Sequence, residues 1–240
     1  MNPKLALILT IFFLFQGLES FGQSQTFLSL YKDHLPYFQE LITGAQYEDP
    51  PDNYIGHPYH KSPDFQDGVL RINGVSYTAV PLLYNENEDE VVTFHPIYQE
   101  KIRIKPGKID EFAFEDGALF RRFSGNELYA QHKNGFYEVR SDGRIKVLVK
   151  NYKKKTVYRE PGRVTYTFLE TLDHFYWWDE DFVEVKNGKQ AIKALGLNKK
   201  DVKKMAKLQK LDAKADLAEY MAALVTMIEN TREDFKGFVN

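Results

Sequence analysis

Two histidines and an aspartate lie close together in one short segment of the chain. His57 and His60 are separated by Pro58 and Tyr59, and Asp64 follows His60 by four residues. Imidazole nitrogens and carboxylate oxygens are common ligands of divalent metal ions. The segment therefore predicts a metal site at His57, His60 and Asp64. Because the spacing is not that of the helical H-E-x-x-H motif, the alternative is a surface loop whose rings pack on the protein.

A second candidate binding feature is a lysine-rich stretch near the C-terminus. Between residues 186 and 214 there are ten lysines and only two acidic residues, which gives a local net charge of +8. A basic helical face of this kind predicts contact with an anionic surface or an acidic envelope protein. The alternative is a face that is merely solvated. The lysines assigned to partner binding are Lys199, Lys200, Lys203, Lys204, Lys207 and Lys210.

Other chemistry has no support in the sequence. The chain has no cysteine, and it lacks the G-x-S-x-G, P-loop and G-x-G-x-x-G motifs that serve nucleophilic catalysis or phosphate binding. We therefore assign no catalytic residue and expect no cofactor. The formal net charge of −2 provides no general attraction to nucleic acid, so nucleic-acid binding is not expected.

The first residues of the chain have the pattern of a cleavable export signal. Lys4 precedes an apolar run over residues 5–15, and the small residues Ser20 and Gly22 predict cleavage before Gln23. The run is shorter than the roughly 20 residues that span a bilayer. We therefore expect a periplasmic or secreted protein with no transmembrane span after cleavage. A lipid anchor is not expected, because no cysteine is present to carry it.

The rest of the chain predicts an α+β fold in four regions. These are a signal peptide (1–22), an N-terminal helix and Pro-rich extended loop (23–67), an antiparallel β domain (68–186) and a Lys-rich helical region (187–240). Asn73-Gly74 is a strong hairpin signal, and Ser141-Asp142-Gly143 is another. We expect a curved sheet or open barrel of about nine strands. The acidic turns at 86–90 and 179–181 are expected to be solvated.

Helical periodicity is confined to the two ends of the mature chain. It predicts one helix over residues 26–42 and others over 190–195 and 213–232. Asn198 is expected to cap a further helix that begins just after it. The apolar sides of the C-terminal helices are expected to pack on the sheet or on one another.

Several of these segments resemble a known group of proteins. The stretch from Gly68 to Gly74, the run Val80–Tyr84 and the aromatic-acidic hairpin Phe175–Val185, followed by Lys-rich helices, are similar to exported β-rich proteins of Bacteroidota. That family has no assigned activity. The resemblance implies export and a β-rich fold, and it implies no catalytic residue.

Three functions are compatible with the sequence. The leading hypothesis is a non-enzymatic cell-envelope protein that binds a partner or ligand through its sheet and its basic helices. The first alternative is a metal-dependent hydrolase that uses the loop from His57 to Asp64. The second is a carrier of a lipid or other hydrophobic ligand inside a curved sheet.

Overall fold

The computed structural model describes residues 39–51, 53–95 and 98–231. The chain divides into two units, Met1–Thr43 and Gly44–Asn240. In the first unit only the short helix α3 (Gln39–Ile42) is described. The predicted signal peptide and most of the predicted N-terminal helix, residues 26–38, lie outside the described residues.

The second unit contains one large open sheet of 12 strands. The strands are β1 (Gly44–Gln46), β2 (Tyr54–Ile55), β3 (Gln66–Ile72), β4 (Val75–Asn85), β5 (Glu90–His95), β6 (Glu100–Ile104), β7 (Ile109–Phe114), β8 (Leu119–Phe123), β9 (Gly135–Asp142), β10 (Lys146–Glu160), β11 (Arg163–Trp178) and β12 (Asp181–Val185). A short 3-10 helix, η1 (Pro106–Lys108), precedes β7. The spatial order is β1-β6-β5-β4-β3-β7-β8-β9-β10-β11-β12. All pairings are antiparallel except that of β2, which pairs in parallel with β11.

The fold is therefore β-rich and mainly antiparallel, as predicted, but the number of about nine strands is wrong. Two of the additional strands, β1 and β2, are three and two residues long and lie within the segment predicted to be an extended loop. Strands this short are held by their neighbours and have no detectable periodicity. In contrast, β10 and β11 run continuously for 15 and 16 residues.

Tight turns fix the register of the hairpins. Asn73 and Gly74 both have positive φ, 49° and 79°, and they join β3 to β4 as the sequence predicted. Asp179 and Glu180 also have positive φ and join β11 to β12. Side chains without a β-branch tolerate this left-handed backbone best, which explains the residue types at both turns.

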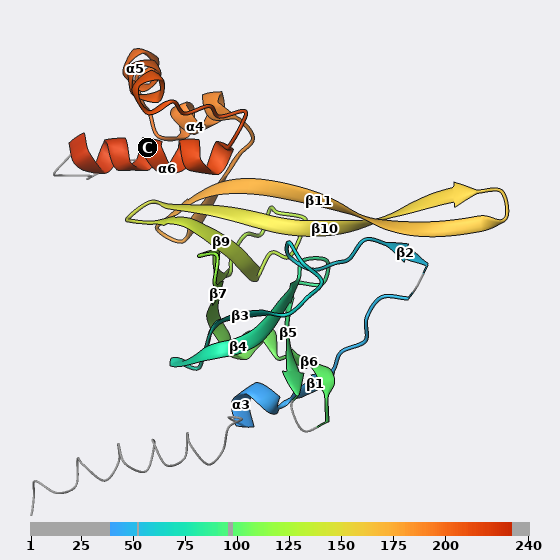
Figure 1. The fold of residues 1–240 in the computed structure, drawn as a ribbon. Coiled ribbons are helices and arrows are strands. Elements are labelled where there is room, and N and C mark those ends of the chain that lie inside the picture. Colours follow the sequence, from blue (N-terminus) through green and yellow to red (C-terminus); the bar gives the residue numbers. More distant parts are fainter. Residues whose placement is uncertain (1–38, 52, 96–97, 232–240) are drawn as a thin grey trace, which may run out of the picture. The chain divides into compact units, whose positions relative to one another are not determined.

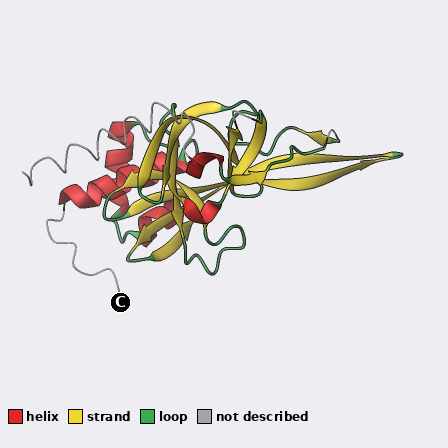
Figure 2. Cartoon of the chain, turned by 90° about the horizontal axis from the view of Figure 1, so that it is seen from below, coloured by secondary structure: helices red, strands yellow, loops and turns green. Residues whose placement is uncertain are grey.

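The hairpin of β10 and β11 forms a long ribbon (Figures 1 and 2). The two strands pair without a register shift from Lys146 opposite Trp177 to Glu160 opposite Arg163. Only one end of the ribbon has partners on both sides: β9 pairs with β10 as far as Val149, and β12 pairs with β11 from His174 onward. The other end extends beyond β9 and β12, and its one neighbouring strand among the described residues is the two-residue β2, beside Tyr166 and Thr167 of β11. We call residues 154–169 the distal ribbon.

Three helices cover one end of the ribbon (Figure 1). They are α4 (Gly188–Ala194), α5 (Lys199–Gln209) and α6 (Leu217–Thr231). The side chain of Asn187 caps α4, and that of Asn198 caps α5 as predicted, by accepting a bond from the Lys200 amide. Apolar residues of α6, such as Met221 and Leu224, pack with Val147 and Tyr176 of the ribbon. The space between the sheet and these helices is thus filled by apolar side chains.

Candidate functional site

A buried ion pair fixes the turn between β4 and β5. The ammonium of Lys150 on β10 is fully buried and donates to Asp89 Oδ1 at 2.5 Å and to the Phe136 carbonyl at 2.7 Å. Asp89 also accepts from the Tyr84 hydroxyl at 2.6 Å and from the Phe136 amide. Burial lowers the pKa of Lys150, and the nearby carboxylate opposes that shift. These bonds therefore hold the β4–β5 turn against β9 and β10, which lie further along the curled sheet.

The same turn carries a second buried acidic group. Glu86 is fully buried, and its Oε1 lies 2.6 Å from Nδ1 of His60. The prediction that the acidic residues at 86–90 are solvated is therefore wrong for Glu86 and Asp89. Their carboxylates enter the interior because His60 and Lys150 supply partners there, and an unpaired carboxylate would not be stable in that position.

The structure does not bring His57, His60 and Asp64 together. His60 is buried against Phe114 and Phe120, with ring centroids 5.6 and 5.1 Å away. His57 is half-buried, with its ring 6.1 Å from that of Tyr59, and Asp64 is exposed. Among the described residues, no group of three or more histidine, aspartate or glutamate side chains is arranged to hold a metal ion. The ring of His60 instead forms a hydrogen bond with the carboxylate of Glu86.

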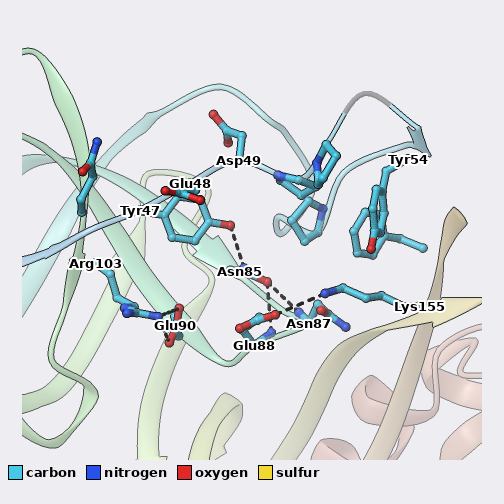
Figure 3. Close-up of a pocket in the computed structure, with 15 residues that line it drawn as sticks. Tyr47, Glu48, Asp49, Tyr54, Asn85, Asn87, Glu88, Glu90, Arg103 and Lys155 are labelled. Carbon is cyan, nitrogen blue, oxygen red and sulfur yellow. Dashed lines mark hydrogen bonds and ion pairs between the residues drawn. The ribbon is translucent and has the colours of Figure 1, made fainter.

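A polar pocket of about 450 Å³ opens beside this turn, at the foot of the distal ribbon (Figure 3). Its walls come from the β1–β2 segment, the β4–β5 turn, β6 and the ribbon. The lining residues are Gln46, Tyr47, Glu48, Asp49, Pro50, Pro51, Tyr54, Pro58, Asn85, Asn87, Glu88, Glu90, Arg103, Lys155 and Phe168. The volume lies within the roughly 300–1,000 Å³ that is usual for small-molecule sites.

Two pairs of charged side chains within the lining contact each other, and a third lining carboxylate pairs with a lysine beside the pocket. Arg103 Nη1 lies 3.0 and 3.3 Å from the two carboxylate oxygens of Glu90, and Lys155 Nζ lies 3.3 Å from Glu88 Oε1. Lys155 lies toward one end of the pocket, Arg103 with Glu90 lies toward the other, and Glu88 lies between them (Figure 3). Asp49 accepts two bonds from Lys101, at 2.7 and 2.8 Å. The lining thus carries four carboxylates and two cations, and Lys101 beside it supplies a third cation for Asp49.

Burial and neighbouring hydrogen-bond donors shift the pKa values of two carboxylates in the pocket. Partial burial raises the pKa of Glu90, and the neighbouring Arg103 opposes that change. Burial also acts to raise the pKa of Asp49, but the bonds from Lys101 and Tyr59 outweigh it and hold the pKa below its usual value. Each of these carboxylates is therefore positioned by a specific donor.

Aromatic rings and prolines form the other wall. Tyr54 stacks on Tyr166 at 4.8 Å and on Phe168 at 5.4 Å between ring centroids, and the ammonium of Lys155 lies 5.8 Å from the Tyr54 ring centre. The amide of Tyr166 donates to the Asn53 carbonyl at 3.1 Å, which ties the β2 segment to the ribbon. The ring of Tyr54 is thus held at a defined position at the edge of the pocket.

The distal ribbon exposes large apolar side chains on both faces. About half of each side chain is open to solvent along the ribbon: Val157 (51%), Tyr158 (59%), Val164 (48%) and Leu169 (58%). The neighbouring Ile55 on β2 is 60% exposed. Two-stranded ribbons are marginally stable alone, and contiguous exposed apolar surface is a common mark of an interaction site.

The lysines predicted for partner binding do share one surface. At 100° per residue, Lys199, Lys200, Lys203, Lys204 and Lys207 fall within an arc of about 140° on α5, opposite the buried Val202. Lys210 follows at the C-cap. All six are exposed. Within the described part of the chain, none of the six forms an ion pair.

Compared with known protein families, curated proteins and solved structures, the chain matches none. None of the helices in residues 39–51, 53–95 and 98–231 has the length and apolar character needed to cross a bilayer. The functional argument therefore depends on the geometry of the pocket and the distal ribbon. Sequence reasoning missed both. The one signal available in the sequence is the cluster of Tyr and Pro at 47–59, which by itself predicts only an extended loop.

Proposed function

We propose that this protein is a non-enzymatic binding protein of the cell envelope that docks a protein partner along the distal ribbon. The observation that carries the proposal is the set of half-exposed apolar side chains on both faces of a ribbon that extends past β9 and β12. Surface of this kind is costly to leave in water, and a partner would bury it.

The free edge of β10 indicates how such a partner is held. The Lys153 amide points away from β11, because it donates to the Glu86 carbonyl at 3.3 Å. Strand residues two apart point their amides in the same direction, so those of Lys155, Val157 and Arg159 also point away from β11. None of these three amides has a backbone partner among the described residues. An incoming strand can therefore add to this edge by main-chain hydrogen bonds.

The charge along the free edge of β10 determines which kind of partner strand can pair with it. Residues 153–159 include four basic side chains and no acidic one. A second copy of the same edge would place like charges opposite one another, which is unfavourable in paired strands. An extended segment that carries acidic side chains between apolar ones would instead complement both the charge and the exposed valine and tyrosine.

Photo-crosslinking tests this docking mode. A photoreactive residue at position 158 should give a discrete protein adduct in cells that make the protein, and one at Val75, exposed on another hairpin, should not. Val157→Pro in the same chain should abolish the adduct, because it removes one outward amide, and proline is tolerated at strand edges. Val157→Thr keeps the amide and should retain the adduct. An adduct that survives Val157→Pro, or no adduct from position 158, would show that the partner does not add to this edge.

The envelope location belongs to the same proposal. The apolar run after Lys4, the small residues before Gln23 and the absence of cysteine support export followed by release from the membrane. Amino-terminal sequencing of the protein from its own cells tests this directly. A start at Gln23 is the expected result, and an intact Met1 in the envelope fraction would contradict cleavage.

A further inference from the structure

The pocket at the foot of the ribbon is shaped for a ligand different from a protein strand. Nine of its 15 lining side chains are amide or charged groups, two are tyrosines, and the remaining four are three prolines and Phe168. A purely apolar ligand would strip water from those polar groups without replacing their hydrogen bonds, which is unfavourable. The ligand must therefore be rich in hydrogen-bonding groups.

The pairing of charges argues against a highly charged ligand. An anion would have to approach four carboxylates, those of Glu48, Asp49, Glu88 and Glu90. A polyvalent cation would have to separate the Arg103–Glu90 and Lys155–Glu88 pairs, which already satisfy two of those carboxylates. Glu48 is the one lining carboxylate without an ion pair in the described part of the chain. Three of the four carboxylates are therefore compensated by a neighbouring cation, and Glu48 leaves a single uncompensated negative charge in the lining.

A hydroxyl group fits such a lining because it donates and accepts at once. Paired guanidinium, ammonium, carboxylate and amide groups offer donors and acceptors side by side. Asn85 holds its amide in place by donating to the Tyr47 hydroxyl at 2.8 Å while it accepts from the amides of Asn87 and Glu88. The polar lining is therefore fixed before a ligand arrives, which lowers the entropic cost of binding.

The aromatic wall of the pocket adds a second requirement for the ligand, a flat apolar face. The ring of Tyr54 is held by Tyr166 and Phe168, and three prolines extend the apolar wall. A sugar ring carries C–H groups on its flat faces and hydroxyls around its rim, so one face suits the ring of Tyr54 while the rim meets the polar groups. From this combination we infer that the pocket binds a neutral saccharide of one or a few rings. The inference does not depend on the docking of a partner at the distal ribbon.

Saturation-transfer NMR on the full chain tests the inference with a defined panel. The neutral probes are maltose, cellobiose, lactose, xylobiose and N,N′-diacetylchitobiose, and the charged probes are spermidine and citrate. At least one neutral probe is expected to bind with a Kd below about 10 mM, and neither charged probe is expected to bind comparably. If no neutral probe binds, or if spermidine alone binds, the saccharide assignment is wrong.

Two tyrosine variants place the bound probe in the pocket. Tyr54→Ser should weaken binding at least about tenfold, because it removes the stacking face. Tyr158→Ser is the matched control, since this tyrosine lies on the ribbon outside the pocket and should leave binding unchanged. Equal effects of the two tyrosine variants would place the saccharide elsewhere and overturn the assignment.

Discussion

Replacing Lys150 by methionine should be among the most destabilising single changes in this protein. The side chain is fully buried and holds Asp89 at 2.5 Å. Methionine fills a similar volume but removes the charge, so the carboxylate keeps only the Tyr84 hydroxyl at 2.6 Å and the Phe136 amide. Removing one member of a buried ion pair typically costs about 3–5 kcal/mol. That is a large share of the roughly 5–15 kcal/mol that stabilises an ordinary domain.

Urea unfolding followed by tryptophan fluorescence measures this cost, since both tryptophans lie on β11 at positions 177 and 178. Lys154→Met is the matched control, because Lys154 is exposed on the same strand and should change the free energy of unfolding by less than about 0.5 kcal/mol. In the double variant Lys150→Met/Asp89→Asn the two losses should be less than additive, since no unpaired charge remains. A loss below about 1 kcal/mol for Lys150→Met, or strict additivity in the double variant, would refute the reasoning.

Three further outcomes are expected. Gly135→Ala should lower the free energy of unfolding by about 1–3 kcal/mol in urea titrations, because its Cβ would clash with the buried Asp89 carboxylate and lie 3.0 Å from the Lys150 ammonium. Burial lowers the pKa of His132, so the folded state keeps this ring neutral and loses stability as pH falls through the unfolded value of about 6.5. His132→Asn, which tolerates the local φ of 46°, should therefore flatten the fall in urea midpoint between about pH 7.5 and about pH 5.5. Replacing Lys199, Lys203 and Lys207 together by Gln should reduce co-sedimentation with phosphatidylglycerol vesicles at low salt while leaving stability nearly unchanged, and equal sedimentation of both proteins would contradict an anion-binding face.

The hairpins and helix caps could be predicted because their signals are local. Asn73-Gly74 needs two residues that accept positive φ, and the side chain of Asn198 caps a helix through the amide of Lys200, two residues further on. Strand length could not be predicted in the same way. The lysines at 153–155 look like the end of a strand, yet β10 continues through them because β11 pairs with every residue to Glu160.

The candidate sites could not be predicted because they join segments that are distant in sequence. His60 looked like a metal ligand beside His57, but its partner, Glu86, is 26 residues further along the chain. The pocket draws on the β1–β2 segment, the β4–β5 turn, β6 and the ribbon, and none of these carries a motif by itself. Only the curl of the sheet places them around one space.

The buried and the exposed polar side chains of the β4–β5 turn have different roles. The buried ones hold the turn in place, and this position brings the exposed ones to the pocket. The turn from Asn85 to Glu90 supplies four of the 15 residues around the pocket. Its own position is set from beneath, where Asp89 meets Lys150 and Glu86 meets His60. Because neither of these buried pairs lines the pocket, Glu88 and Glu90 face it instead, where they pair with Lys155 and Arg103. The acidic turn therefore acts as a support on its inner side and as a binding surface on its outer side.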